Sequence, residues 1–182
     1  MKRVVIFLAP GFEEIEAVTP IDVLRRAEVE VIVAGLKPGP ITGSHGITVL
    51  PDTTLDTVRP EDVDMVVLPG GLPGSAHLRE DARVLDFLQR MDKAGKYTCA
   101  ICAAPSVLHA AGVIGNRAIT SHPAVKQDLP QDSYREDRVV VDGSLVTSRG
   151  PGTALEFSLE LVGLLKGPEM AETHAAIMLA RR

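Results

Sequence analysis

The chain has 182 residues, of which 45% are hydrophobic and 24% charged, and its formal net charge is -5. This balance is typical of a globular chain, which excludes intrinsic disorder, and the absence of a basic stripe argues against binding to nucleic acid. Two cysteines are too few for a disulfide-rich secreted scaffold.

The chain opens with a short apolar run, VVIFL at residues 4–8, which we interpret as a buried strand. Lys2 and Arg3 imitate the start of a signal peptide, but Pro10 and Gly11 end the apolar run too early. No segment approaches ~20 apolar residues, so no membrane-spanning helix and no membrane partner are predicted. The expected location is a reducing cytoplasm.

The first half of the chain alternates between helical and strand patterns. Residues 14–27 carry apolar side chains at three-residue steps, which predicts a helix that Pro20 should kink. Residues 29–36 form the next predicted strand, and residues 41–51 a small hairpin with glycines at its turn. A third buried strand is predicted over residues 64–71 and ends in a glycine pair.

The second half continues the same alternation. The predicted helices cover residues 81–94, 105–111, 152–165 and 168–180. The predicted strands cover residues 96–101 and the two arms of a hairpin over 139–148, whose Asp142-Gly143 pair is a strong turn signal. The final helix should pack through one stripe, made of Met170, Ala171, His174, Ile177 and Met178.

Strands that alternate with helices of this length predict the α/β class, with a mostly parallel sheet between two layers of helices. We expect a single domain over residues 1–182. In such folds ligands bind beyond the carboxyl ends of the strands. Pro10-Gly11 with its following acids, Gly70-Gly71 and Cys102 all fall at such ends, which predicts a site there, although parallel strands also end in glycine simply to turn.

Cys99 and Cys102 form a C-x-x-C pair with several interpretations. A redox pair is disfavoured because a strand from Cys99 to Ile101 would hold the two Cα atoms ~10 Å apart. A straight strand would also send the two side chains to opposite faces. A zinc half-site lacks two further ligands with paired spacing among the histidines. For Cys99 we adopt the interpretation of an inert core thiol.

Cys102 differs because Ala103, Ala104 and Pro105 follow it, so that a strand leads through a bend into a helix. The first N–H groups of that helix point back at the bend, where they favour a thiolate and could hold an oxyanion. Burial acts in the opposite direction on the pKa, so its net value stays open. The pattern is that of a nucleophile elbow with cysteine in place of serine, and the residues alone leave an inert thiol as the alternative.

Motifs along nearly the whole chain resemble those of the ThiJ/PfpI superfamily, in the branch of the Parkinson-linked protein DJ-one. They are PGFEEIEAVTPIDVLRRA (10–27), VVLPGG (66–71), AICAAP (100–105), SHP (121–123) and LVTSRGPGTALEFSLELV (145–162). The last motif is long and distinctive. The resemblance implies a flavodoxin-like three-layer sandwich, the fold that class I glutamine amidotransferases share.

The resemblance also implies roles for particular residues. Cys102 matches the reactive cysteine of the family, held in a strained backbone conformation. Glu16 matches the acid that hydrogen-bonds its sulfur, a choice that the residues alone left open between Glu13, Glu14 and Glu16. A protonated carboxyl beside the thiolate would stabilise it and could carry protons.

Further matches concern the surroundings of the thiol. Gly70 and Gly71 match a loop whose amides, with that of Ala103, form an anion pocket. His122 matches a histidine near the thiol. His45 lies where some relatives place an arginine that is contributed across the dimer.

The resemblance separates this chain from two related groups of enzymes. In proteases of the superfamily a histidine directly follows the nucleophile, whereas Ala103 holds that position here. Glutamine amidotransferases need a downstream His-x-Glu, which the sequence lacks. His122 is the one histidine that could substitute, although a lone histidine is more often structural.

The activity implied by the resemblance is a cofactor-independent reaction on small reactive carbonyls, with no metal. Cys102 would add to a 2-oxoaldehyde such as methylglyoxal, Glu16 would move a proton, and water would release a hydroxy acid; glycated adducts are related substrates. The alternative is a peroxide sensor or redox-regulated chaperone that uses the same thiol, and a fold relative with an inactive site is a third reading. The family usually forms a homodimer, for which Pro10 to Arg26 and the exposed hairpin are the expected contact surfaces.

Overall fold

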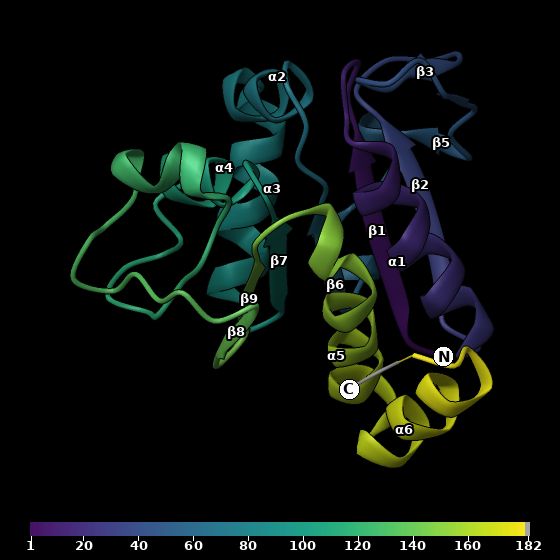
Figure 1. The fold of residues 1–182 in the computed structure, drawn as a ribbon. Coiled ribbons are helices and arrows are strands. Elements are labelled where there is room, and N and C mark those ends of the chain that lie inside the picture. Colours follow the sequence, from purple (N-terminus) through teal and green to yellow (C-terminus); the bar gives the residue numbers. More distant parts are fainter. Residues whose placement is uncertain (181–182) are drawn as a thin grey trace.

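The computed structural model describes residues 1–180 of the 182. Its main sheet has seven strands in the order β5-β2-β1-β6-β7-β9-β8 (Figure 1). In chain order these strands are β1 (Arg3–Leu8), β2 (Glu30–Gly35), β5 (Thr53–Thr54), β6 (Met65–Leu68), β7 (Tyr97–Ile101), β8 (Val139–Asp142) and β9 (Leu145–Ser148). All neighbouring pairs in this sheet are parallel except β8 with β9. A separate antiparallel hairpin consists of β3 (Ile41–Thr42) and β4 (Thr48–Val49).

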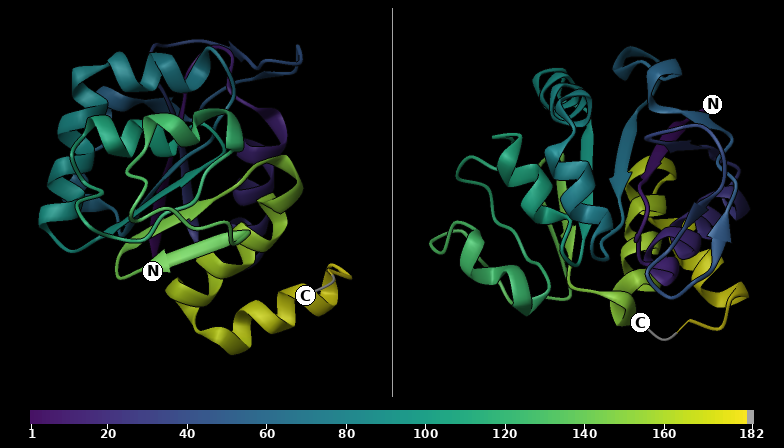
Figure 2. Two further views of the ribbon diagram at one scale, coloured as in Figure 1. Left: turned by 60° about the vertical axis from the view of Figure 1, so that its left-hand side comes forward. Right: turned by 90° about the horizontal axis from the view of Figure 1, so that it is seen from above.

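Helices cover both faces of the sheet (Figure 2). They are α1 (Glu14–Arg26), α2 (Gly74–Glu80), α3 (Ala82–Lys93), α4 (Pro105–Ala110), α5 (Ala154–Lys166) and α6 (Pro168–Ile177). Helices α1, α5 and α6 pack into one core, and α2, α3 and α4 into the other. The expected α/β class, a mostly parallel sheet between helices, is therefore confirmed. None of the helices within residues 1–180 is long and apolar enough to cross a membrane.

The alternation of side chains along β1 shows why this sheet needs two layers of helices. Val4 and Ile6 belong to the core on the α1 side, whereas Val5 and Phe7 belong to the core on the α3 side. All four are fully buried, and each such side chain stabilises the fold by about 1.5–3 kcal/mol. A strand that is apolar on both faces thus becomes a central strand of the sheet.

Several local expectations are corrected. Helix α2, strand β5 and the 3₁₀ segment η3 (Pro123–Asp128) were not predicted. The final helix does pack, but Ile177 is 68% exposed, and Ala171 and Ala175 make the buried contacts. Ala171, Met170 and Met178 of the predicted stripe do pack against the core, and Ala175 joins them in place of Ile177.

The order of the central strands positions the candidate site. β6 pairs with β1 on one side and with β7 on the other, all three in parallel. Their carboxyl ends therefore lie side by side, as expected for ligand sites in parallel sheets. This edge brings together the first turn of α1, the Gly70-Gly71 loop and the bend at Cys102.

Candidate functional site

The bend at Cys102 is held in an unusual backbone conformation. Strand β7 ends at Ile101, and Cys102 has a φ of 64°, in the left-handed region that costs a non-glycine residue about 1 kcal/mol or more. Two main-chain hydrogen bonds fix it there. Its N–H donates to the carbonyl of Ser148 at 3.0 Å, and its carbonyl accepts from the N–H of His122 at 2.8 Å. The strand beside β7 and the segment before η3 therefore together hold the bend in place.

This bend corrects the expected placement of the two thiols. Cys99 is fully buried in the core on the α1 side, and Cys102, which is partly buried, packs against the same core. A straight strand would have sent Cys102 to the other face, but the left-handed residue reverses its direction. Both cysteines are free thiols. Burial raises the pKa of Cys99 well above its usual value, which fits an inert core thiol.

Glu16 lies beside Cys102 with no exposed surface. Its Oε2 accepts the N–H of Gly70 at 2.9 Å, whereas Oε1 is buried without a hydrogen-bonding nitrogen or oxygen partner among residues 1–180. Burial raises the pKa of Glu16 to about 7, and the charge of Glu13 adds to this effect. Hydrogen bonds with Cys102 and Gly70 act in the opposite direction and are outweighed. Near pH 7 the carboxyl is therefore about half protonated, whereas an ordinary glutamate would be almost fully ionised.

Opposing influences act on the pKa of the Cys102 thiol, and their balance could not be read from the sequence. Burial and the neighbouring Glu16 raise the pKa of Cys102 to about 12, and the amides of Ala103 and Gly71 lower it only in part. The expected lowering by the following helix is not what dominates, because α4 has only six residues and the sulfur is largely desolvated. Between about pH 7 and 12 the pair of side chains holds one proton and one negative charge. When that proton lies on Glu16, the sulfur is an anion that faces two amide donors.

The glycine loop has two distinct tasks. A side chain on Gly70 would place its Cβ 2.7 Å from both the Cβ of Cys102 and Oε2 of Glu16, so only glycine fits between them. The amide of Gly70 is bound to Glu16, whereas the amide of Gly71 joins that of Ala103 at the sulfur. Of the three amides predicted to form an anion pocket, two therefore face the thiol and one orients the acid.

A closed ring of three hydrogen bonds ties the acid to the glycine loop. The N–H of Glu13 donates to the carbonyl of Gly70 at 3.0 Å, and the N–H of Gly70 donates to Glu16. The N–H of Glu16 in turn donates to Oε2 of Glu13 at 2.7 Å, which makes Glu13 the N-cap of α1. From the sequence, Glu13 was considered only as a rival to Glu16 for the role of the acid. Its position before the first helical residue is the signal that would have indicated the capping role.

His122 contacts the thiol segment through its backbone rather than its ring. The ring is exposed, and its Nδ1 accepts the N–H of Ala124 at 3.2 Å, which caps η3. Within residues 1–180 the ring makes no hydrogen bond to Cys102 or Glu16. The structure therefore brings His122 near the site but gives its ring a structural partner.

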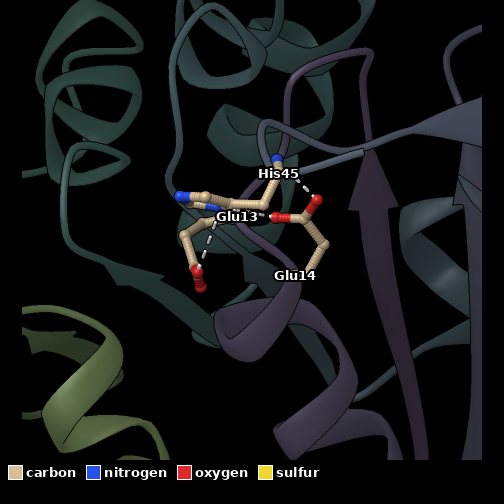
Figure 3. A group of neighbouring side chains, drawn as sticks. All are labelled: Glu13, Glu14 and His45. Carbon is tan, nitrogen blue, oxygen red and sulfur yellow. Dashed lines mark hydrogen bonds and ion pairs between the residues drawn. The ribbon is translucent and has the colours of Figure 1, made fainter. Parts of the chain in front are cut away.

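His45 lies beside Glu13 and Glu14 at the start of α1 (Figure 3). Its Nδ1 is 3.0 Å from Oε2 of Glu14, and its N–H donates to Oε1 of Glu14 at 2.7 Å. Burial disfavours a charge on Glu14, but the hydrogen bonds from His45 and Ile47 outweigh it and lower the pKa of Glu14 to about 2. Atoms of Glu13, Glu14 and His45 that could bind a metal lie within 4.8 Å of one another, and this group includes neither cysteine. Glu14 already accepts hydrogen bonds on both oxygens, so an ion pair with His45 accounts for the group.

The fold and the bend together define an α/β protein with a cysteine–carboxyl pair at the carboxyl edge of its sheet. The sequence matches the DJ-1/PfpI family over residues 2–164, and the chain belongs to that family. It is 45% identical to protein dj-1beta of Drosophila melanogaster over 181 residues, which is 98% of this chain and 97% of that protein. It is also 38% identical to the glutathione-independent glyoxalase DJR-1.2 of Caenorhabditis elegans, over 92% of this chain and 91% of that protein.

The solved structures agree with this assignment. The structure described as Toxoplasma gondii DJ-1, oxidized, superposes on this chain with a TM-score of 0.97 at 36% identity, and each chain is covered completely. The resemblance to the DJ-one branch of the ThiJ/PfpI superfamily is thus confirmed, as is the flavodoxin-like sandwich that it implied.

Proposed function

We propose that this protein is a cofactor-independent cysteine enzyme that converts 2-oxoaldehydes such as methylglyoxal to 2-hydroxy acids. The observation that carries the proposal is the single proton held between Glu16 and Cys102, with two amides at the sulfur. When this proton lies on Glu16, the pair supplies a nucleophile and a proton carrier in one place. The glyoxalase name of the relative from Caenorhabditis elegans supports the same activity.

The reaction balances without an external oxidant or reductant. The Cys102 thiolate forms a bond to the aldehyde carbon, and the carbonyl oxygen takes the proton of Glu16 to give a hemithioacetal. Glu16, now a carboxylate, removes the hydrogen of that carbon as a proton and returns it to the neighbouring carbon, while the hydroxyl proton moves to the ketone oxygen, which leaves a thioester of the hydroxy acid. Water then cleaves the thioester, which releases the hydroxy acid and the Cys102 thiolate and returns a proton to Glu16. Methylglyoxal and water thus become lactate.

Three variants test the proposal by lactate formation from methylglyoxal. Cys102→Ser should reduce the rate to background, because a serine hydroxyl is a much weaker nucleophile than a cysteine thiolate. Glu16→Ala should do the same, because it removes the proton carrier. Cys99→Ala is the matched control, since it changes a thiol three positions away that burial keeps neutral. Undiminished lactate formation in both Cys102→Ser and Glu16→Ala would contradict the proposal. The related deglycase activity, which restores free thiols or amines from their glycated adducts, should respond to the three substitutions in the same way.

The oxidized state of the solved Toxoplasma gondii DJ-1 structure favours a second function for this chain, peroxide sensing or a redox-regulated chaperone activity. A partly exposed thiol beside a protonated carboxyl and two amides is suited to hold a sulfinate. Mild peroxide treatment followed by peptide mass spectrometry should then add two oxygens to Cys102 and none to Cys99. Equal oxidation of both cysteines would argue against this function.

We also propose that two copies of the chain form a homodimer through the apolar side chains left exposed around α1. Ile15 and Val18 are 54% and 46% exposed on α1, and Ile47 and Leu50 are 57% and 73% exposed near the β3–β4 hairpin. Exposed apolar residues that cluster in this way mark interaction surfaces. Light scattering should give twice the chain mass for the wild type, and Val18→Glu should shift it toward the monomer. A wild-type monomer at micromolar concentration would contradict the dimer.

A further inference from the structure

A hollow of about 420 Å³ lies beside the candidate site, between the start of η3 and the segment after β9. His122 and Gly150 both line it. A Cβ on Gly150 would lie 3.6 Å from the ring of His122 and 4.0 Å from Oε1 of Glu16. Gly150 therefore borders both the hollow and the buried acid, although neither Cys102 nor Glu16 lines the hollow itself.

The charges around this hollow leave one cation unneutralised. Arg138 pairs with Glu156, whose carboxylate lies 2.6 Å away, and Glu136 pairs with Lys126 at 2.8 Å. Arg149 is half-buried and donates from Nη1 to the main-chain carbonyl of Glu136 at 2.7 Å. No carboxylate of residues 1–180 forms an ion pair with its guanidinium. Arg149 lowers the pKa of Glu136 only after the larger effect of Lys126.

We infer that Arg149 binds the carboxylate of the substrate, and that the preferred substrates are small carbonyl compounds with a carboxylate beyond the reactive aldehyde. The inference rests on the proposed role of Cys102 as the nucleophile. A guanidinium with free N–H groups matches a carboxylate in both shape and charge. A phosphate dianion would bring two negative charges to a wall that offers one unpaired cation, so a carboxylate fits this hollow better.

The test compares the rates at which iodoacetate and iodoacetamide alkylate Cys102. The two reagents are similar in size and react with the same thiolate, so the ratio of their rate constants cancels any change in the thiol pKa. Intact-mass and peptide spectrometry report the rates, and Cys99 is protected by burial. Arg149→Met should lower the iodoacetate-to-iodoacetamide ratio about three- to tenfold, because it removes a cation from a partly desolvated hollow. Arg149→Lys, which keeps the charge, should retain most of the ratio.

Arg135→Met is the matched control. Arg135 also donates only to main-chain carbonyls, at Asp132 and Tyr134, but it does not line the hollow. The iodoacetate-to-iodoacetamide ratio of Arg135→Met should stay close to that of the wild type. A structural role of Arg149 would change both rate constants equally, so an unchanged ratio in Arg149→Met overturns the inference.

The outcome is independent of the glyoxalase proposal. A ratio that falls in Arg149→Met while the wild type makes no lactate from methylglyoxal would support the carboxylate site and contradict the proposed reaction. Lactate formation with an unchanged ratio would contradict the carboxylate site alone.

Discussion

Glu14 and Glu16 lie on opposite sides of the first turn of α1, and both are almost fully buried. Glu14 faces the β3–β4 hairpin, where the side chain and N–H of His45 and the N–H of Ile47 bind its carboxylate. Glu16 faces the thiol and accepts one N–H, from Gly70, while its other oxygen stays without an N–H or O–H partner in residues 1–180. The pKa is about 2 for Glu14 and about 7 for Glu16.

The comparison teaches that burial alone does not set the charge of a carboxyl. Burial raises the pKa of both residues, and the number of donors around each decides whether the charged form survives. Two carboxyls with pKa values pushed apart are typical of sites that combine a fixed charge with a proton carrier. Here Glu14 is the fixed charge and binds the β3–β4 hairpin, and Glu16 is the proton carrier of the proposed reaction.

The largest expected effect is on activity, where substitutions of Glu16 and Glu14 should have different consequences. Glu16→Gln should lower kcat/KM for methylglyoxal about 100-fold or more, because an amide occupies the same space but cannot transfer the proton. Glu14→Gln should leave kcat/KM within about threefold of the wild type, because Glu14 has no contact with the thiol. Steady-state kinetics on both variants check this contrast. Equal losses in the two variants would contradict the division of roles.

Stability should depend on pH through Glu16 with a definite sign. Its pKa rises from an ordinary 4.5 to about 7 on folding, so its contribution is complete below about pH 4.5 and is lost as the pH rises through 7. The free energy of unfolding should therefore fall by roughly 2 kcal/mol between pH 5 and 8. Denaturant unfolding at the two pH values measures this fall, and it should be much smaller in Glu16→Gln. If Glu16→Gln left the fall in unfolding free energy between pH 5 and 8 unchanged, a group other than Glu16 would be responsible for it.

Glu14 should act on stability in the opposite range of pH. Glu14→Gln weakens the charge-assisted hydrogen bonds from His45 and Ile47, so unfolding should become easier by about 1.5–2 kcal/mol at pH 7. Because the pKa of Glu14 is lowered on folding, its contribution is present above pH 4.5 and lost as the pH falls toward 2. Wild type and variant should thus converge in acid. Thermal melts from pH 7 down to 3 test this, and a constant difference across the series would contradict it.

The smallest expected effect on stability is that of replacing His45, the exposed partner of Glu14. The side chain of His45 is 71% exposed, and its pKa is raised by the hydrogen bond to Glu14 and by the charge of Glu14. His45→Gln should therefore lower Tm less than Glu14→Gln does, since the backbone N–H of residue 45 still binds Glu14. The loss should be present below pH 6.5 and vanish as the pH rises through the raised pKa. A larger loss at pH 9 than at pH 6 would contradict the ion pair.

Much of the fold was predictable because buried strands and amphipathic helices leave clear periodic patterns. The runs at residues 4–8 and 64–71 became the central strands β1 and β6, and the Asp142-Gly143 turn became the β8–β9 hairpin. Helix α2 was not predicted because GSAHLRE begins with glycine after Pro73 and has little apolar periodicity. Short elements such as α2 and β5 are determined by tertiary packing rather than by local pattern.

The site was predictable in its members but not in its geometry. The positions of Cys102 and Gly70 at strand ends indicated where to look, and resemblance selected Glu16 from three neighbouring acids. The direction of the Cys102 side chain depends on a φ that no sequence pattern specifies. The pKa of Glu16 depends on how many donors reach it, and its one N–H donor, Gly70, lies at a sequence separation of 54.

Glu16, Gly70 and Cys102 belong to three segments that meet only after β1, β6 and β7 have paired. A newly synthesised chain therefore carries two equivalent thiols, and completion of the sheet makes them different by sealing Cys99 in the core and giving Cys102 its neighbours. A difference in reactivity between the two thiols is in this sense a report of correct assembly. Any event that separates these strands, such as heat or a destabilising substitution, removes Cys102 from its carboxyl and amides at the same moment that it exposes the core.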